Sequence, residues 1–267
     1  MDKINKIATK LLATGKVQII IGYTEGSKGR IRPFFARNEE ECRKLIFDER
    51  CVQNLAVFLY KKEVSQKGQQ AIVSNVHTLR GIIRLAAEKQ IKEGDLIAIA
   101  VSDKEQFLEV HTLEAIENYL SDRTFQLNES DEILLDKLNA MNPLERWIFW
   151  QNEMKNCIRC YACRQACPLC YCSQCVVEIN QPQWIPVFAN KIGNTEWHIM
   201  RAMHLAGRCV ECGQCGRVCP ENIPIHLLPI RLAREIKALY GSTTGISKDE
   251  NCEISTYKYE DRENFFE

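Results

Sequence analysis

Two features of exported and membrane proteins are missing from this chain. The first sixteen residues carry charges throughout and contain no uninterrupted apolar stretch of the kind that a secretory signal needs. The apolar runs at 17–21 and 96–101 have the length of strands and fall far short of the roughly 18 residues that span a bilayer. These absences predict a soluble, cytoplasmic chain with no direct membrane span.

An excess of charge is also missing. The 35 basic and 35 acidic side chains cancel, so the chain has no broad basic surface for nucleic acid. It also lacks the strongly acidic face of many mobile ferredoxins. The balance favours a subunit docked in a complex over a freely diffusing electron carrier.

Familiar catalytic and nucleotide-binding motifs are absent as well. The glycine-rich segment 22–29 follows a strand-like run, but it matches neither G-x-G-x-x-G nor G-x4-G-K-[ST], and we expect a flexible loop there. No catalytic triad, His/Glu metal-hydrolase motif or basic aromatic patch is present. The sequence therefore assigns no catalytic residue, and it leaves open whether the chain is an enzyme.

Cysteine, in contrast, is abundant. The 14 cysteines are clustered in a long chain without a signal, which favours metal or cluster ligation over a disulfide scaffold. Two segments match C-x2-C-x2-C-x3-C-P, the bacterial ferredoxin pattern, at every position. They are Cys157, Cys160, Cys163, Cys167 and Pro168, and then Cys209, Cys212, Cys215, Cys219 and Pro220.

The spacing predicts two [4Fe-4S] clusters. Three closely spaced cysteines let a tight loop wrap a cubane, and in two-cluster ferredoxins the fourth cysteine of each run ligates the other cluster. Two zinc ribbons are the alternative, but zinc has no use for the third cysteine or for the x3-C-P ending. The predicted ligands are Cys157, Cys160, Cys163 and Cys219 for one cluster, and Cys209, Cys212, Cys215 and Cys167 for the other.

Further residues near the motifs have two interpretations each. Cys170, Cys172 and Cys175 follow the first run and could form a third metal or iron-sulfur site with Cys51 or Cys42, or they could be small buried side chains. Between the runs, residues 195–206 have helical spacing. We expect Met200 and Met203 to pack around the clusters, and His198 and His204 to pack there too, with ligation or proton transfer as the alternative.

Hydrophobic periodicity predicts two domains and a tail. Helices are expected at 2–14, 39–47, 51–61 and 78–90, and strands at 17–21, 71–74 and 96–101. The strand-helix-strand order predicts an α/β docking domain at 1–140 with a parallel sheet. After a polar, acidic connection at 122–142, helices at 144–156 and 226–240 flank an α+β dicluster ferredoxin-like domain at 143–240. Residues 241–267 read as a polar tail, with Phe265 and Phe266 near its end.

These residues resemble a known family. Segments 157–172 and 205–213 are similar to the dicluster domain of iron-sulfur subunits akin to the beta chain of methanogen-type formate dehydrogenases and deazaflavin-dependent hydrogenases. Similar domains occur in sulfhydrogenase and anaerobic sulfite reductase subunits and beside heterodisulfide-reductase-like modules. Segments 15–22 and 48–55 carry a looser resemblance.

The resemblance implies a subunit of an anaerobic oxidoreductase complex. Such a subunit relays electrons between partners such as formate dehydrogenase, hydrogenase, a nicotinamide flavoprotein or a heterodisulfide reductase. Some relatives bind flavin in the domain corresponding to 1–140, so a catalytic subunit with FAD there is the alternative. Where similar chains have a Lys-Gly-Cys-Asp-Ser-Arg segment, this one differs at 74–80, and FAD is therefore not favoured.

Overall fold

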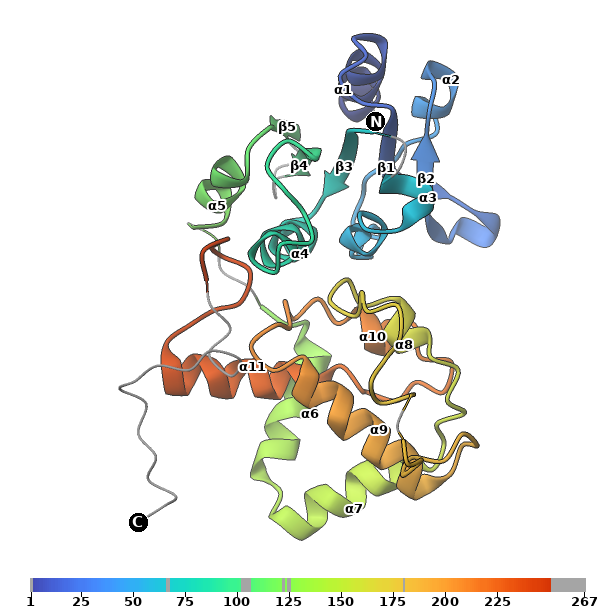
Figure 1. Ribbon diagram of the computed structural model, residues 1–267, viewed down its shortest axis with the longest axis vertical. Coiled ribbons are helices and arrows are strands. Elements are labelled where there is room, and N and C mark those ends of the chain that lie inside the picture. Colours follow the sequence, from blue (N-terminus) through green and yellow to red (C-terminus); the bar gives the residue numbers. More distant parts are fainter. Residues whose placement is uncertain are drawn as a thin grey trace.

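The computed structural model describes residues 2–65, 68–101, 107–121, 123, 126–179 and 181–250. A sheet with its helices occupies residues up to 121, here called the N-terminal part. A helical region from residue 126 onward, here called the C-terminal part, lies against it (Figure 1).

The N-terminal part is built on a five-stranded sheet with the order β2-β1-β3-β4-β5. Its strands are β1 Ile19–Glu25, β2 Ile31–Ala36, β3 Gln70–Ser74, β4 Leu96–Val101 and β5 Phe107–Val110. The central strands β1, β3 and β4 run parallel, as predicted, whereas β2 and β5 are antiparallel to their neighbours. A short hairpin joins β1 to β2, and a hairpin can only give an antiparallel pair. The sheet is therefore mixed.

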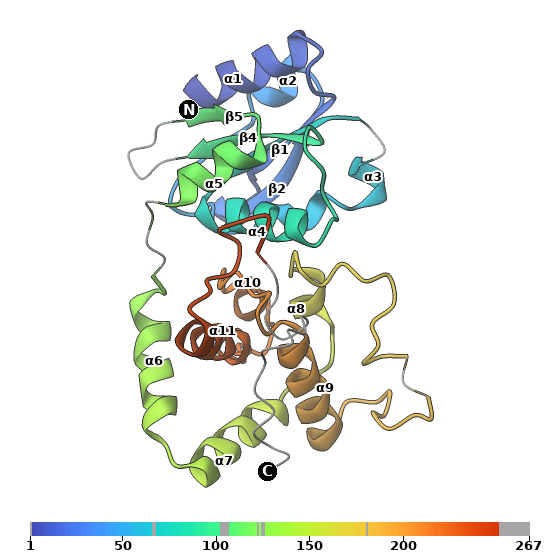
Figure 2. The ribbon, with the colours of Figure 1, turned by 60° about the vertical axis from the view of Figure 1, so that its left-hand side comes forward.

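Helices cover both faces of this sheet. Helix α1 (Asp2–Ala13) lies on one face and α4 (Val76–Ala87) on the other, with α5 (Leu113–Ser121) beside α4 (Figure 2). All residues of β3 and β4 are buried, which accounts for their continuous apolar runs. The β3-α4-β4 unit confirms the predicted strand-helix-strand pattern.

Two expected helices of the N-terminal part are much shorter than predicted. The first ends at Cys42 as α2 (Glu39–Cys42), because the Ile46 amide donates to the Tyr23 carbonyl of β1 at 2.9 Å. The second reduces to a 3-10 helix, η2 (Leu55–Phe58). Tertiary pairing has overridden local helical spacing in the first case. The remaining short segments are η1 Ser27–Gly29 and α3 Lys62–Ser65.

The C-terminal part is helical in the residues that the structure describes, whereas an α+β fold was predicted. Its longer helices are α6 Glu129–Ala140, α7 Pro143–Met154, α9 Lys191–His204 and α11 Leu227–Tyr240. The cysteine segments form loops that lead into single-turn helices, α8 (Ala162–Gln165) and α10 (Gln214–Arg217). Left-handed residues inside these loops prevent the extended backbone that a strand needs.

Helix α6 occupies a stretch that was expected to be a connection. Its side chains Leu135 and Leu138 pack against Leu227 and Ile230 of α11. The acidic residues that suggested a linker lie in its first turn, where negative charge favours a helix N-terminus. Helix α6 thus lies with the C-terminal helices, and the division into domains at 140–143 stays a prediction.

Part of the expected tail returns to the N-terminal part. After α11 the chain rises toward α4 (Figure 2), and the Thr244 carbonyl accepts bonds from Arg80 Nε and Nη2 at 3.1 and 2.9 Å. The last described residue is Glu250, so Phe265 and Phe266 lie outside the described residues. Among the described helices, none is long and apolar enough to cross a membrane.

Candidate iron-sulfur site

The first cysteine loop has an unusual backbone. Arg159 and Tyr161 both have positive φ, 53° and 60°, a region that side chains other than glycine rarely enter. The Arg159 amide points back at the Cys157 sulfur, with N···Sγ at 3.4 Å. Single-turn helix α8 then presents Cys163. Such strained positions persist at functional sites because the surrounding structure imposes them.

The second cysteine loop repeats this geometry at equivalent positions. Glu211 and Gly213 have φ of 56° and 67°, and the Glu211 amide lies 3.4 Å from the Cys209 sulfur. Helix α10 begins directly after Gly213, as α8 begins after Tyr161. The two loops are therefore built alike, as expected of segments that wrap the same kind of group.

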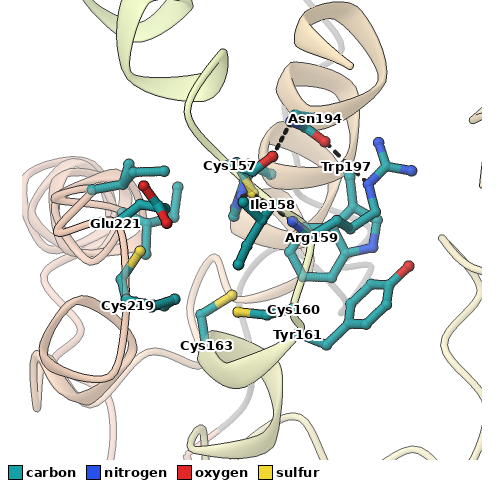
Figure 3. Close-up of a pocket in the computed structure, with 14 residues that line it drawn as sticks. Cys157, Ile158, Arg159, Cys160, Tyr161, Cys163, Asn194, Trp197, Cys219 and Glu221 are labelled. Carbon is teal, nitrogen blue, oxygen red and sulfur yellow. Dashed lines mark hydrogen bonds between the residues drawn. The ribbon is translucent and has the colours of Figure 1, made fainter. Parts of the chain in front are cut away.

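The fold brings the fourth cysteine of each run to the other loop. One pocket is lined by Cys157, Cys160 and Cys163 together with Cys219. Figure 3 shows the sulfurs of the first loop on one side of this pocket and Cys219 facing them from the opposite chain segment. We call this pocket the first site.

A second pocket, the second site, shows the reciprocal arrangement. It is lined by Cys209, Cys212 and Cys215 together with Cys167. The structure thus groups the eight cysteines into the two crossed quartets that the spacing predicted. Their role as ligands stays a prediction.

The donor set in both sites fits iron-sulfur clusters. All thirteen cysteines in the described residues are free of disulfides. Burial raises the pKa of Cys163 and of Cys215 to about 11, so these thiols need a metal to hold them as thiolates. In the described residues, no three or more His, Cys, Asp or Glu side chains could hold a single metal ion.

Helix α9 supports the first site from behind. Asn194 Nδ2 donates to the carbonyls of Met154 and Cys157 at 3.0 and 2.7 Å, and Asn194 Oδ1 accepts from Arg159 Nε at 3.1 Å (Figure 3). The polar side chain thereby fixes the start of the cysteine loop on a helix. Trp197 lines the same pocket.

The two histidines of α9 have different surroundings. His198 is buried, its Nε2 lies 3.3 Å from the Cys157 sulfur, and burial lowers its pKa to about 3. A neutral ring beside a ligand position is consistent with packing and leaves ligation untested. His204 is exposed near the third cysteine group. Met200 packs near the first site, whereas Met203 is 49% exposed.

The three additional cysteines share one cavity. Cys170, Cys172 and Cys175 line it together with three arginines, Arg164, Arg201 and Arg208. The two expected fourth ligands both lie in the N-terminal part. The Cys51 sulfur accepts from the Asp48 amide, and Cys42 is buried in the hydrophobic core of the N-terminal part. The structure does not bring Cys51 or Cys42 to this cavity, and a third metal site stays a prediction.

The N-terminal part covers the second loop. His77 Nδ1 lies 3.4 Å from the Val210 carbonyl, and Arg80 Nη2 forms an ion pair with Glu211 Oε1 at 3.1 Å. Tyr60 donates to the Cys167 carbonyl at 3.5 Å. Two backbone carbonyls and one side chain around the second site are therefore held by side chains of a different part of the chain.

Two further contacts tie the two parts together. Arg208 directly precedes the second run in the sequence. Its Nε and Nη2 each donate to a carboxylate oxygen of Glu88 at 2.6 Å. Arg217 Nη2 bridges the carbonyls of Val52 and Cys212 at 3.0 and 2.6 Å. The segment at 74–80, which differs from similar chains, supplies His77 and Arg80 and so belongs to this interface.

Sequence reasoning missed the buried arginines. Arg159 and Arg201 are 9% and 4% exposed, and both lie beside cysteine sites. The available signal was weak: Arg201 interrupts the apolar face of a predicted helix, and Arg159 lies between two cysteines. A buried guanidinium is rare without a partner: Arg159 donates to the Asn194 side chain and the Pro186 carbonyl, and Arg201 donates to the Cys163 carbonyl.

The glycine-rich segment 22–29 is only partly a loop. Residues 22–25 belong to strand β1, so the predicted loop was wrong there, because Gly22, Tyr23 and Thr24 are buried in the sheet. Residues 26–30 join β1 to β2, and η1 within them has only three residues. A phosphate-binding loop leads from a strand into a longer helix, and this segment does not.

Comparison with known proteins agrees with this geometry. Residues 156–224 match the family model described as a 4Fe-4S dicluster domain. An F420-dependent formate dehydrogenase subunit beta from Methanocaldococcus jannaschii is 29% identical to the chain over 143 residues. The match covers 47% of this chain and 35% of that subunit, so the chain spans about a third of the length of its relative.

These matches confirm the resemblance predicted from the cysteine segments. The chain contains a 4Fe-4S dicluster domain and is a distant homologue of that beta subunit. The domain and its many cysteines imply bound iron-sulfur clusters.

Proposed function

We propose that the chain is an electron-transfer subunit of a multi-subunit oxidoreductase, with two [4Fe-4S] clusters held by crossed cysteine quartets. The first site would use Cys157, Cys160, Cys163 and Cys219, and the second Cys209, Cys212, Cys215 and Cys167. When bound, each cluster accepts and releases one electron at a time. No residue of the chain is assigned a catalytic role.

One observation carries this proposal. Two loops 52 residues apart, beginning at Cys157 and Cys209, share the same left-handed positions and the same amide-to-sulfur contact. The pocket at each loop is also lined by the fourth cysteine of the other run. A single zinc ion requires only four ligands and gives no reason for this exchange. A pair of adjacent cubanes does.

The protein supplies orientation and shielding. Asn194 and Arg159 hold the first loop, and Glu88 and Arg80 hold the second through Arg208 and Glu211. Amides aimed at the sulfurs of Cys157 and Cys209 stabilise thiolate charge.

The N-terminal part acts as a scaffold in this proposal. In parallel α/β sheets, cofactors bind beyond the carboxyl ends of the strands. After β3 that region is filled: Asn75 donates to the Cys51 carbonyl at 3.3 Å, and His77 faces Val210. The described contacts therefore use this edge for packing against the second loop, which disfavours FAD there.

A partner subunit is supported by exposed apolar surface. Large apolar side chains in one segment of the C-terminal part are between 52% and 78% exposed, more than a chain working alone needs. They are Val176, Ile179, Trp184, Val187, Phe188 and Ile192. The related beta subunit belongs by its name to a formate dehydrogenase, and partners of that kind, hydrogenases or heterodisulfide-reductase-like modules are proposed for this chain.

Iron analysis tests the proposal. Anaerobically purified protein is expected to contain about eight iron and about eight sulfide atoms per chain. About four iron atoms, or zinc in place of iron, would contradict it. About twelve iron atoms would support a third cluster at Cys170, Cys172 and Cys175.

The same preparation separates the relay from a catalytic flavin subunit. We expect no stoichiometric flavin in its absorption spectrum after the clusters are removed. A flavin released in a ratio of about one per chain would favour the alternative, in which the N-terminal part binds FAD.

A further inference from the structure

Helix α9 directs two of its side chains at Cys157. His198 follows Asn194 by four residues, so the two side chains lie on one face of the helix. Asn194 Nδ2 donates to the Cys157 carbonyl at 2.7 Å, and His198 Nε2 lies 3.3 Å from the Cys157 sulfur. One residue of the first quartet is therefore held at its backbone and contacted at its sulfur.

The His198 ring has little room to turn away from this sulfur. The residue is 4% exposed and lines the pocket of the first site. Its ring packs edge-on against Trp197, with 4.8 Å between the two ring centroids. Close packing of this kind holds a side chain in one orientation. The contact with Cys157 is thus built into the fold of α9.

The hydrogen of this contact belongs to the histidine. A cysteine that ligates a cluster is a thiolate, which has no proton and can only accept a hydrogen bond. His198 Nδ1 is buried and has no hydrogen-bond partner among the described residues, so no acceptor there competes for the ring hydrogen. Both considerations favour the tautomer that carries its hydrogen on Nε2, facing the sulfur.

The equivalent sulfur of the second site has no such donor. Cys157 and Cys209 are the first cysteines of their runs, and each sulfur lies 3.4 Å from the amide two residues later. Within the described residues, a side-chain donor is added at the Cys157 sulfur and none at the Cys209 sulfur. These two positions, otherwise alike, differ by one hydrogen bond.

We propose that the hydrogen bond from His198 Nε2 to the Cys157 sulfur raises the reduction potential of the first-site cluster and leaves that of the second unchanged. The inference rests on the proposed function, because it requires clusters in the two quartets. One-electron reduction adds negative charge to a cluster and its thiolates without making or breaking a bond. A donor aimed at a ligand sulfur stabilises the more negative form more strongly, and such hydrogen bonds help to set cluster potentials. His198 is thus a positioning residue that acts on the cluster through Cys157.

The test compares wild type, His198→Phe, His198→Gln and His204→Phe as full-length proteins. Phenylalanine keeps an aromatic ring without its nitrogens, whereas glutamine keeps an N–H donor at about the reach of Nε2. His204 is the matched control because it lies on the same helix but lines a different cavity. The midpoint potential of each cluster is measured by titration with dithionite followed by electron paramagnetic resonance. The signal retained in Cys167→Ser identifies the first site.

His198→Phe is expected to lower the first-site potential. The expected change is about tenfold in the ratio of reduced to oxidised cluster at a fixed potential, or about 59 mV for one electron. The second-site potential should stay at its wild-type value. His198→Gln should restore most of the loss, and His204→Phe should change neither potential.

A further measurement needs no substitution. Wild-type protein with isotopically labelled histidine nitrogen is reduced, and the coupling of the first-site spin to that nitrogen is measured by pulsed paramagnetic resonance. A hydrogen bond through the Cys157 sulfur should give a weak coupling, whereas a nitrogen bound directly to iron would give a strong one. If His198→Phe does not assemble the first cluster, this coupling decides.

Different outcomes test the proposed function and the inference. Fewer than two clusters in the wild type would refute the proposed function, and the inference with it. With two clusters present, four outcomes would overturn the inference alone. They are an unchanged first-site potential in His198→Phe, an equal shift in His198→Gln or His204→Phe, an equal shift in both clusters, and a nitrogen coupling that is absent or as strong as that of a ligand.

Discussion

The ion pair between Glu88 and Arg208 joins the N-terminal part to the start of the second cysteine run. Both carboxylate oxygens accept bonds from Arg208 at 2.6 Å, and Oε1 also accepts from Arg84 Nε at 2.9 Å. The Glu88 side chain is 10% exposed. Replacing Glu88 by Gln keeps its shape and removes its charge, so that Arg84 and Arg208 lose this carboxylate partner.

The structure offers a matched control for this change. Glu132 and Arg234 form the same two-bond geometry, at 2.6 and 2.8 Å, between α6 and α11, but the Glu132 side chain is 42% exposed. Breaking a buried pair costs about 3 to 5 kcal/mol, whereas an exposed pair contributes about 0 to 1 kcal/mol. Glu88→Gln should therefore lower the free energy of unfolding by several times as much as Glu132→Gln.

The pH dependence of Glu88→Gln follows from the pKa of Glu88. Burial alone would raise that pKa, but the hydrogen bonds and charges of Arg208 and Arg84 outweigh it and lower the pKa. A carboxyl group with a lowered folded pKa stabilises the fold above its unfolded pKa, about 4.3, and loses this effect as pH falls through the folded value. The difference between wild type and Glu88→Gln should shrink accordingly as pH falls.

The measurement is anaerobic urea unfolding of the cluster-loaded proteins followed by tryptophan fluorescence. All four tryptophans lie at residue 147 or later, so the signal reports the C-terminal part that Glu88 holds. Equal losses in the two variants, or a Glu88→Gln effect that does not change with pH, would refute the reasoning. Either result would mean that burial does not determine how much the Glu88–Arg208 ion pair contributes to the free energy of unfolding.

Two substitutions test the sites directly. Cys167→Ser should disturb the cluster of the second site and spare the cluster of the first site. Electron paramagnetic resonance distinguishes the signals of the two clusters. Loss of the first-site cluster alone would mean that each run ligates its own cluster. Gly216→Ala should prevent assembly of the second site, because an added Cβ would collide with the His226 ring; unchanged iron content would show that His226 can move aside.

The local features of the sites were predictable from sequence. Cysteine spacing specified the crossed quartets because a cubane imposes its own geometry on any loop that wraps it, whatever the rest of the fold does. The β3-α4-β4 unit was predictable because its buried strands and amphipathic helix give two distinct periodicities.

The features that depend on distant partners were not predictable. Leu135 and Leu138 of α6 pack against α11, about ninety residues later. The acidic first turn of α6 resembles a linker. The contact of His77 with Val210 is a single polar pair without a periodic signal.

The two sites differ in their access to solvent even though their loops are alike. Ile158 and Val210 occupy the same position in the two runs, but Ile158 is 57% exposed and Val210 is 2% exposed. The N-terminal part produces this difference because its His77 and Arg80 contact the second loop, and Arg217 of α10 donates to its Val52 carbonyl. A partner can therefore approach the first site more closely than the second.

This asymmetry makes a prediction for the full-length protein. A soluble paramagnetic chelate should enhance the spin relaxation of the first-site cluster more than that of the second, because the effect falls steeply with distance of approach. Cys160 is exposed at the first site, while Cys212, its equivalent at the second, is only partly exposed. Power saturation of the two resonance signals measures the effect, and Cys167→Ser assigns them. Equal relaxation of both clusters would mean that the N-terminal part does not shield the second site, and electrons could then enter or leave the chain at either one.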